Sequence, residues 1–345
     1  MKFSEVAYFG CQIIKMHLQP KRRIPLSMYI VLTNRCNNHC VYCRTHNLPQ
    51  EDLWNTEILK SVMLEMKKSG VRRVQFTGGE PMLRDDIGEI IAYAKSLGFF
   101  VGISTNGYKV SERIDELRDV DVVFLSYDGP DKVHSRLRGK NNLEDVKSAL
   151  VALKSKGIRV WTTTVLTRWN VNFIKDIVNF SRKHNILANF NRLEFFSDYP
   201  CYLHPHIKEV EELVLRGDER KRAFQELINL KLSGAPIGSS LKYLKSVLEW
   251  PYDERITDSR PSKSYKCWAG RAYGHLNSDG KLYSCGWGSG SVLGVDVLKE
   301  GFKSAWSKLV PLNNCQSCSH ACGVENNLIF SLNFSVILNA FRQLH

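Results

Sequence analysis

The sequence lacks an uninterrupted hydrophobic run long enough to cross a membrane. A spanning helix needs about 20 mostly apolar residues, and the two most apolar terminal stretches, residues 3–18 and 328–341, are shorter. The sequence also lacks a dense block of one charge, because its net charge of +13 is scattered over many segments. Scattered cations are typical of solvated helix faces, so a nucleic-acid partner is not expected. The length of 345 residues favours two domains.

No signal peptide is recognisable ahead of the cysteines, and most of the ten cysteines fall in tight clusters. This pattern is typical of metal or reactive sites in a reducing compartment and not of a secreted disulfide scaffold. We therefore expect a cytoplasmic protein. The isolated Cys11 and Cys201 are expected to be small buried hydrophobic residues.

The first cysteine cluster lacks a fourth ligand. Cys36, Cys40 and Cys43 form a Cys-x3-Cys-x2-Cys pattern directly behind an apolar segment, residues 28–32. A structural zinc site closes its coordination shell with four ligands, and a cluster held only by cysteine also needs four. Three thiolates on one short loop would leave one metal position open for another ligand. Cysteines at such spacings also occur in zinc knuckles, and this alternative remains for the triplet alone.

A second motif follows about thirty residues later. Residues 73–77 read as a short buried strand, and the chain continues as Gly78-Gly79-Glu80-Pro81. Glycines let the backbone approach a ligand closely, and the glutamate supplies an acceptor for an ammonium group.

Together the two motifs resemble the signature of the radical S-adenosylmethionine (SAM) superfamily. The resemblance implies an enzyme in which the three cysteines hold a [4Fe–4S] cluster. The open iron of that cluster binds SAM, and the reduced cluster cleaves SAM to a 5′-deoxyadenosyl radical. It also implies that Gly78, Gly79 and Glu80 hold the SAM amino group and that the backbone at Tyr42 contacts the adenine.

The middle of the chain alternates between short β-branched runs and amphipathic runs. Six strands alternating with helices predict a parallel sheet with right-handed crossovers, and six are too few for a closed eight-fold barrel. We therefore expect a partial (βα)6 barrel, which is also the core of the family, with ligands at the carboxyl ends of the strands. The expected strands are residues 29–33, 73–77, 99–104, 122–126, 160–166 and 189–195, and the expected helices are 56–69, 86–97, 111–117, 143–156 and 173–184.

Polar residues follow two more of the expected strands. The resemblance places Ser104 and Asn106 near the SAM ribose and carboxylate. Ser126 and Asp128 belong to a Ser-x-Asp-Gly sequence that continues to Arg138. Asp128 could orient SAM or substrate, and Arg138 could pair with the SAM carboxylate. The alternative is that Ser-x-Asp-Gly is a favourable turn sequence and nothing more.

A second set of cysteines lies near the C-terminus and comprises Cys267, Cys285, Cys315, Cys318 and Cys322. A turn sequence between the first two predicts a β-hairpin. The set resembles the auxiliary-cluster module called SPASM, or its shortened form called twitch. Five cysteines cannot complete two clusters of four ligands each, so one auxiliary [4Fe–4S] cluster is expected. The first four would ligate it, with Cys322 as a competing or spare ligand. A zinc ribbon is the alternative.

These features divide the chain into an N-terminal amphipathic extension (1–27), the radical SAM barrel (28–196), a helical bridge (197–262), the auxiliary-cluster domain (263–324) and a C-terminal apolar helix (325–345). We expect both terminal helices to pack on the barrel. The alternative is peripheral contact with the inner face of the membrane, through the apolar tails and Lys21, Arg22 and Arg23.

The resemblance implies hydrogen-atom abstraction from a substrate. Enzymes with this second domain often modify peptides, so a peptide or protein side chain is the leading expectation. A lipid, a cofactor precursor or another small molecule is the alternative substrate, and a zinc-stabilised binding protein without catalysis is the contrasting class. An electron donor such as flavodoxin or ferredoxin is the expected partner.

Overall fold

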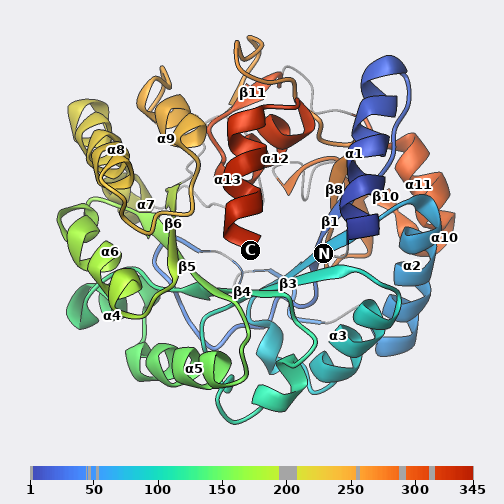
Figure 1. Ribbon diagram of the computed structural model, residues 1–345. Coiled ribbons are helices and arrows are strands. Elements are labelled where there is room, and N and C mark those ends of the chain that lie inside the picture. Colours follow the sequence, from blue (N-terminus) through green and yellow to red (C-terminus); the bar gives the residue numbers. More distant parts are fainter. Residues whose placement is uncertain are drawn as a thin grey trace.

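Parallel strands ringed by helices make up most of the computed structural model (Figure 1). The structure describes residues 3–43, 45, 48–51, 54–193, 208–253, 257–286, 293–310 and 315–344. The main sheet has nine strands in the order β10-β9-β8-β1-β2-β3-β4-β5-β6. Seen along its axis, the sheet curves into a barrel that is open on one side, with helices outside it.

The six expected barrel strands are all present, and each pairs in parallel with its neighbour. Three have the predicted bounds, and the others are shifted by one to three residues. The predicted partial (βα)6 barrel is therefore confirmed. The strands are β1 (Ser27–Val31), β2 (Arg73–Thr77), β3 (Phe100–Thr105), β4 (Val122–Ser126), β5 (Val160–Leu166) and β6 (Leu187–Arg192).

Helices cover the outer face of these strands and follow the amphipathic pattern of the sequence. Capping fixes their ends: the Asn55 side chain accepts from the Ile58 amide at the start of α2, and Gly70 ends that helix with φ of 113°. The helices are α2 (Thr56–Ser69), α3 (Ile87–Ser96), α4 (Asp131–Arg138), α5 (Leu143–Ser155) and α6 (Ile174–Lys183).

Two predictions in this region are wrong. Residues 111–117 were expected to form an α-helix, but only the 3-10 helix Ile114–Leu117 forms there. The segment is short, and the Arg113 side chain before it donates to the carbonyls of Met82 and Arg84. Helix α4 was not expected, because its polar sequence has only Val133 and Leu137 as buried apolar residues.

The described part of the bridge, residues 208–253 and 257–262, is mainly helical. It contains α7 (Lys208–Leu213), α8 (Gly217–Leu232) and α9 (Leu241–Leu248). Arg220 is buried at the centre of this unit, where it pairs with Asp253 at 2.9 Å and donates to the Trp250 carbonyl at 2.8 Å. Cys201 lies outside the described residues.

The cysteine-rich segment continues the barrel sheet. Strand β8 (Tyr273–Leu276) pairs in parallel with β1, and β9 (Lys281–Tyr283) folds back antiparallel onto β8. The predicted hairpin is therefore confirmed, although it belongs to the same sheet as the barrel. Strand β10 (Val295–Asp296), α10 (Val297–Glu300) and α11 (Phe302–Lys308) follow, and a separate ladder joins β7 (Thr257–Asp258) to β11 (Ser317–Cys318).

The expected single C-terminal helix is two helices, α12 (Ala321–Phe330) and α13 (Phe334–Leu344), with a bend of 113° between them. The chain breaks at Leu332, whose φ is +59°, and the Asn333 side chain accepts from the Ser335 hydroxyl at the start of α13. Helix α12 contacts α9 and β6, so it occupies the open side of the barrel. Among the described residues no single helix is long and apolar enough to span a membrane. Helices α12 and α13 taken together have the length and composition of a span, but the chain is bent between them.

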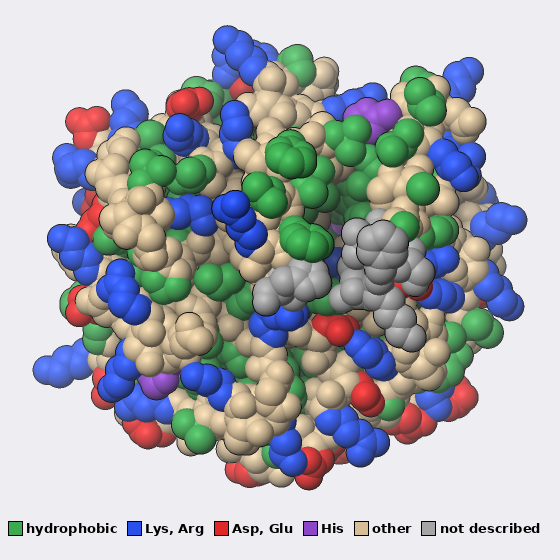
Figure 2. Space-filling model, in the orientation of Figure 1, with side chains coloured by type: hydrophobic (Ala, Val, Ile, Leu, Met, Phe, Trp, Pro, Cys, Tyr) green, Lys and Arg blue, Asp and Glu red, His purple; other side chains and the backbone are tan. Residues whose placement is uncertain are grey.

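Helix α1 (Phe3–Leu18) packs against the barrel, as expected for the N-terminal extension. Ile13 and Met16 are buried in a cluster with Tyr273 and Phe330. Cys11 lies on the exposed face of the helix, so the prediction that it is buried is wrong. Figure 2 shows hydrophobic side chains gathered over α13.

Candidate active site

The first cysteine cluster lies on the loop that leaves the carboxyl end of β1. A turn closed by the Cys43 amide and the Cys40 carbonyl, at 2.9 Å, brings the second and third cysteines to the same side of the loop. Cys40 is buried, and burial raises the pKa of its thiol to about 12. Burial also raises the pKa of Cys36. Thiols bind metal as thiolates, so a metal must displace protons here.

The glycine turn after β2 packs directly on the cysteine loop. The Gly79 amide donates to the Thr33 carbonyl at 2.7 Å, and the Glu80 amide donates to the Arg35 carbonyl at 2.8 Å. A Cβ atom on Gly79 would lie 2.1 Å from the Arg35 oxygen, and one on Gly78 would lie 2.4 Å from the Thr33 oxygen. The close approach that the sequence predicted is thus made to the cysteine loop, which any larger residue would displace.

Glu80 is fully buried between β2 and β3. Its carboxylate accepts from the Met82 amide at 3.0 Å, the Thr105 hydroxyl at 2.8 Å and the Asn106 amide at 2.7 Å. Burial raises its pKa to about 7, against the effect of these donors. Three donors leave about one lone-pair position of the carboxylate for a further partner. Glu80 therefore ties two strand ends together and can still accept from a ligand ammonium.

Asn106 connects the end of β3 to the cysteine loop. The sequence predicted that this residue lies near the cofactor. Its side-chain amide donates to Asn37 at 2.8 Å and lies 4.0 Å from the Cys36 sulfur. Ser104 faces the inside of the barrel, where its hydroxyl accepts from the Gln75 side chain at 3.1 Å. The sequence assigned both residues to SAM, and this assignment stays a prediction for both.

A buried ion pair joins the end of β4 to the cysteine loop. Asp128 is fully buried and pairs with Arg138 at 2.7 Å, and the Tyr42 hydroxyl donates to the same carboxylate oxygen at 2.6 Å. A guanidinium nitrogen of Arg138 lies 3.9 Å from the Cys40 sulfur. The Arg138 side chain thus places a positive charge beside the Cys40 thiol. Ser126, at the end of β4, lies opposite Thr163 of β5 on the inner face of the sheet.

His134 was left without a role by the sequence reasoning, although it lies in the same run as Asp128. Its Nδ1 atom accepts from the Asp128 amide at 3.0 Å, so the proton is on Nε2, which donates to Asn142 at 3.1 Å. Burial lowers the pKa of His134 to about 4. Asn142 in turn donates to the Asn106 carbonyl at 3.1 Å. A neutral hydrogen-bonded chain therefore links the β3 and β4 ends, and only its histidine was visible in the motif.

The cysteine loop fits a bound polar group. Asn38 is buried, and both polar atoms of its side chain have no hydrogen-bond partner in the described protein. In the described part of the chain, no three His, Cys, Asp or Glu side chains converge on one metal ion. A cuboidal cluster does not require that convergence, because each thiolate binds a different iron.

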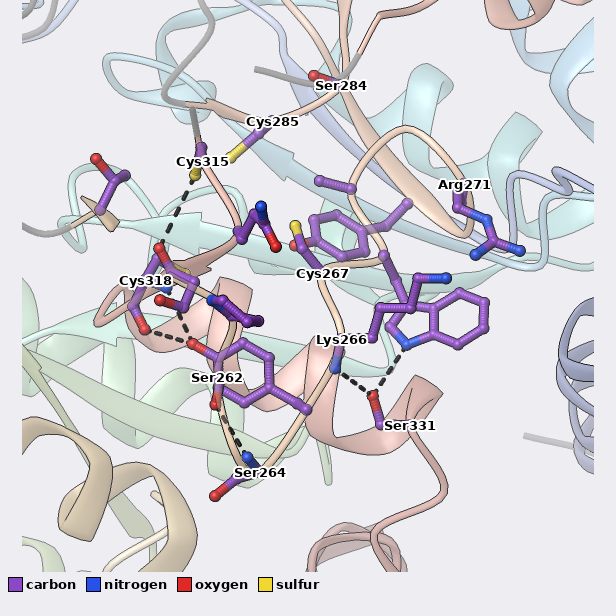
Figure 3. Close-up of a pocket in the computed structure, with 18 of the residues that line it drawn as sticks. Ser262, Ser264, Lys266, Cys267, Arg271, Ser284, Cys285, Cys315, Cys318 and Ser331 are labelled. Carbon is purple, nitrogen blue, oxygen red and sulfur yellow. Dashed lines mark hydrogen bonds between the residues drawn. The ribbon is translucent and has the colours of Figure 1, made fainter. Parts of the chain in front are cut away.

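Four of the five C-terminal cysteines line one cavity of about 740 Å³ (Figure 3). They are Cys267, Cys285, Cys315 and Cys318; Figure 3 shows the Cys285 thiol pointing toward Cys315, whose own thiol is directed to the Ser317 carbonyl. Cys267 precedes β8 and Cys285 follows β9, so both cysteines lie outside the strands of the hairpin. Cys322 is not part of this lining; its thiol is hydrogen-bonded to Tyr29 of β1.

Neighbouring side chains hold two of the four cysteines in place. The Tyr265 hydroxyl accepts from the Cys318 amide at 3.0 Å and donates to the Cys318 carbonyl at 2.6 Å. Burial raises the pKa of Cys267, while the Ala269 amide and the Asn327 side chain favour its thiolate. Such contacts around metal ligands fix their orientation. The cavity therefore has the donor set and the support expected of a four-cysteine cluster site.

Comparison with known proteins gives the class of this site. Residues 30–181 match the family model described as the radical SAM superfamily. A probable GTP 3′,8-cyclase from Methanococcus maripaludis is 29% identical over 206 residues, covering 56% of this chain and 67% of the relative. The GTP 3′,8-cyclase of Chlorobaculum tepidum is 32% identical over 184 residues, covering 50% and 55%. An AdoMet-dependent heme synthase from Oleidesulfovibrio alaskensis is 31% identical over 153 residues, covering 42% and 39%.

Two solved structures share the fold. Streptococcus suis SuiB bound to S-adenosylmethionine has a TM-score of 0.64 at 17% identity, covering 85% of this chain and 68% of SuiB. The structure of anSMEcpe with bound AdoMet and the Cp18Cys peptide has a TM-score of 0.62 at 16% identity, covering 92% and 99%.

The barrel and its cysteine loop define a SAM-dependent iron–sulfur enzyme. Residues 30–181 of the chain carry a radical SAM domain. The predicted fold, enzyme class and cofactors agree with these matches: SAM, the SAM-binding [4Fe–4S] cluster and one auxiliary [4Fe–4S] cluster.

Proposed function

We propose that the enzyme removes a hydrogen atom from a small organic molecule held inside the barrel. The observation that carries this proposal is the convergence of the cysteine loop, the glycine turn and Asn106 at the carboxyl ends of β1, β2 and β3. The bound cluster and SAM supply a 5′-deoxyadenosyl radical at this position. The protein supplies placement and charge.

The chain's own residues orient the cofactors. Cys36, Cys40 and Cys43 would hold the [4Fe–4S] cluster and leave it able to bind SAM. Glu80 fixes the turn against β3 through Thr105 and Asn106, and its carboxylate would accept from the SAM amino group. Arg138 balances the negative charge of the thiolates and is itself held by Asp128. These roles assign each residue to binding, and none of them moves a proton.

The substrate chamber is the inside of the barrel. On β5 the residues facing the outer helices are buried, whereas Trp161, Thr163 and Val165 are partly exposed. The same alternation occurs on β6, where Leu187, Asn189 and Asn191 are the partly exposed residues. Because helices cover the outer face, the partly exposed alternate positions meet solvent on the inside. These inward positions would line a substrate held inside the barrel.

The chamber lining favours a substrate whose reacting part is uncharged. In the carboxyl-terminal halves of β2 to β6, the inward positions carry hydroxyl, amide, aromatic and aliphatic groups and no charged side chain. Trp161 and Phe124 meet edge to face at 5.3 Å. The Gln75 carbonyl oxygen and the Asn189 amide nitrogen are buried without partners in the described protein. These groups suit a small molecule bearing hydroxyl or amide groups.

The relatives' names support a small molecule over a peptide. Two are named as GTP cyclases and one as a heme synthase, and both names refer to small molecules and not to peptides. The neighbours bound to peptides share only the fold at this level of identity. We therefore place the alternative expectation, a cofactor precursor or other small molecule, ahead of peptide modification.

The four-cysteine cavity is proposed to hold the auxiliary [4Fe–4S] cluster. Its four thiols saturate a cluster and leave no iron open, so this site should not cleave SAM. Because iron–sulfur clusters require reducing conditions, the cytoplasm is the proposed location, and a low-potential flavodoxin or ferredoxin is the proposed reductant.

Formation of 5′-deoxyadenosine from SAM tests the proposal. Anaerobically purified and reconstituted protein is incubated with dithionite and SAM, alone and with deuterated candidate substrates. Cys36→Ala, Cys40→Ala and Cys43→Ala should each reduce product at least a hundredfold. Cys11→Ala is the matched control, because Cys11 is exposed on α1, and it should retain full activity.

The substrate is identified by transfer of its deuterium into 5′-deoxyadenosine. Full activity in any of the three loop variants would contradict the assigned ligands. Stoichiometric zinc without iron in the purified protein would end the enzyme hypothesis.

A further inference from the structure

Charge of one sign surrounds the auxiliary cavity. Lys263, Lys266 and Arg271 line it, and so does Pro20, which is followed directly by Lys21 and Arg22. Among the described residues that line the cavity there is no aspartate or glutamate. The five cations, Lys21, Arg22, Lys263, Lys266 and Arg271, are called the basic rim below.

The four outer cations of the basic rim are accessible. Lys21, Arg22, Lys263 and Lys266 are exposed, and they come from two segments far apart in the sequence. The Arg271 guanidinium bridges these segments, because it donates to the Arg22 carbonyl at 3.4 Å. The rim is thus one continuous surface, formed where the α1 end meets the loop before β8.

Arg23, the third residue of the basic triplet, has a different role. Its guanidinium donates to the Gly270 carbonyl at 2.8 Å and the Leu309 carbonyl at 2.9 Å, so it fastens the rim to the fold. Burial and the neighbouring charge of Arg271 lower the pKa of Arg23. Two arginines held close together and partly buried create a positive potential around the cavity mouth.

The basic rim lies directly over the cysteines. Lys266 precedes Cys267 in the chain, which places their Cα atoms about 3.8 Å apart. Figure 3 shows Lys266 and Arg271 on one side of the cavity and Cys285 and Cys315 on the other. A group held by the four cysteines is therefore reached from outside through a mouth edged by cations.

We propose that the basic rim docks an acidic one-electron carrier protein. The docked carrier gives one electron to the cluster held by the four cysteines; the carrier is oxidised, the cluster is reduced, and no bond is broken and no proton moves. This inference rests on the proposed auxiliary cluster. It goes beyond the proposed function because it assigns the surface at which the partner binds.

A carrier protein accounts for both the cations of the basic rim and the cysteines beneath them. Its acidic patch complements cations drawn from separate segments, and the cysteines at the cavity floor give the electron a destination. An anionic bilayer would account for the charges alone. The experiment below distinguishes the carrier protein from the bilayer, because a bilayer would bind to the basic rim without reducing the cluster.

Binding and electron transfer are measured separately on the holoenzyme. Association with an acidic plant-type [2Fe–2S] ferredoxin is followed anaerobically by biolayer interferometry over a range of salt. Lys263→Glu/Lys266→Glu reverses two rim charges, and Lys68→Glu/Lys183→Glu is the matched control, since both of its lysines are exposed on the barrel helices α2 and α6. Iron content and the cluster spectrum are recorded for each variant. A Lys263→Gln/Lys266→Gln variant is included in case charge reversal disturbs the cluster.

The rim variant should associate about tenfold more slowly at low salt, because exposed interface charges act mainly on the association rate. The control should change less than twofold. The difference should vanish near 0.5 M salt, where the Debye length is about 4 Å. Reduction of the residual cluster in a Cys36→Ala/Cys40→Ala/Cys43→Ala background should slow in parallel with binding.

Equal association of the rim and control variants would overturn the proposal. Binding to phosphatidylserine vesicles with no binding to the ferredoxin would also overturn it and would assign the rim to a membrane. Rim-dependent ferredoxin binding in a protein that cleaves no SAM would leave this inference standing while the proposed function failed.

Discussion

Removal of the Asp128 carboxylate should be costly, because it leaves a buried charge without a counter-ion. Asp128 is fully buried and lies 2.7 Å from the Arg138 guanidinium, whose side chain is 10% exposed. The other carboxylate oxygen accepts from the Val165 amide at 3.0 Å. Asp128→Asn keeps the shape of the side chain and an acceptor for Val165, but it places an amide N–H where Arg138 and Tyr42 need an acceptor, so it removes both the charge and the acceptor of this pair.

Breaking one partner of a buried pair costs about 3–5 kcal/mol. At roughly 2 °C per kcal/mol for a chain of this size, the melting temperature should fall by about 6–10 °C. Arg138→Met should cost a similar amount, because the Asp128 charge then lacks its cation. The double variant buries no charge, so it should be more stable than the sum of the single changes by at least 2 kcal/mol, roughly.

Denaturant unfolding of the anaerobic apoprotein measures these differences without the contribution of cofactor binding. Glu144→Gln is the control, since Glu144 pairs with Lys147 at the surface, and exposed pairs contribute at most about 1 kcal/mol. If the costs of Asp128→Asn and Arg138→Met add within about 0.5 kcal/mol, the two side chains do not act as a buried pair and the reasoning is wrong.

Three further predictions concern single features of the structure. Burial raises the pKa of Glu80 from 4.5 to about 7. Between these pH values Glu80 is protonated in the folded protein and ionised in the unfolded chain, so the free energy of unfolding should fall by roughly 3 kcal/mol as pH rises through them. Glu80→Gln should remove this dependence of the unfolding free energy on pH between pH 4.5 and 8. Cys322→Ala should retain all iron, because Cys322 does not line the cavity, and loss of about half the iron would return it to the ligand set. If the protein contacts membranes, Lys21→Ser/Arg22→Ser should weaken its salt-dependent sedimentation with anionic vesicles. Arg23 is left unchanged because its side chain donates to backbone carbonyls. No vesicle binding at low salt would leave packing as the only role of the terminal helices.

The sequence predicted the barrel well because each strand and helix carries its own signal. Residues 56–69, 73–77, 122–126 and 160–166 form elements with the predicted bounds, since alternating hydrophobicity and helix caps are local properties. The polar helix α4 escaped prediction for the same reason: it has few buried apolar residues and is held by contacts with the cysteine loop. One such contact is the amide of Val41, which donates to the Leu137 carbonyl.

Site residues were found when they belonged to a motif, but their partners were not. Glu80 was expected to face a ligand, yet most of its hydrogen bonds go to residues at the end of β3. Ser104 and Asn106 were given one role, although Ser104 lies on β3 and faces the inside of the barrel, whereas Asn106 lies beyond the end of the strand and reaches the cysteine loop. These differences depend on which strand ends meet in space, and no spacing within the sequence specifies that.

The continuous sheet gives the two cysteine sites a fixed relation. Strand β1 ends at Val31, five residues before Cys36, and it pairs on its other edge with β8, the first strand of the auxiliary hairpin. Tyr29 of β1 stacks on His275 of β8 at 4.5 Å, and a Cβ atom on Gly286, the residue after Cys285, would lie 2.9 Å from that histidine ring. A rigid, packed path of side chains therefore runs from the auxiliary cysteines to the strand that carries the SAM-binding loop. Movement of one site relative to the other would require β1 and β8 to separate, so the geometry between the two clusters is set by the sheet and not by a linker.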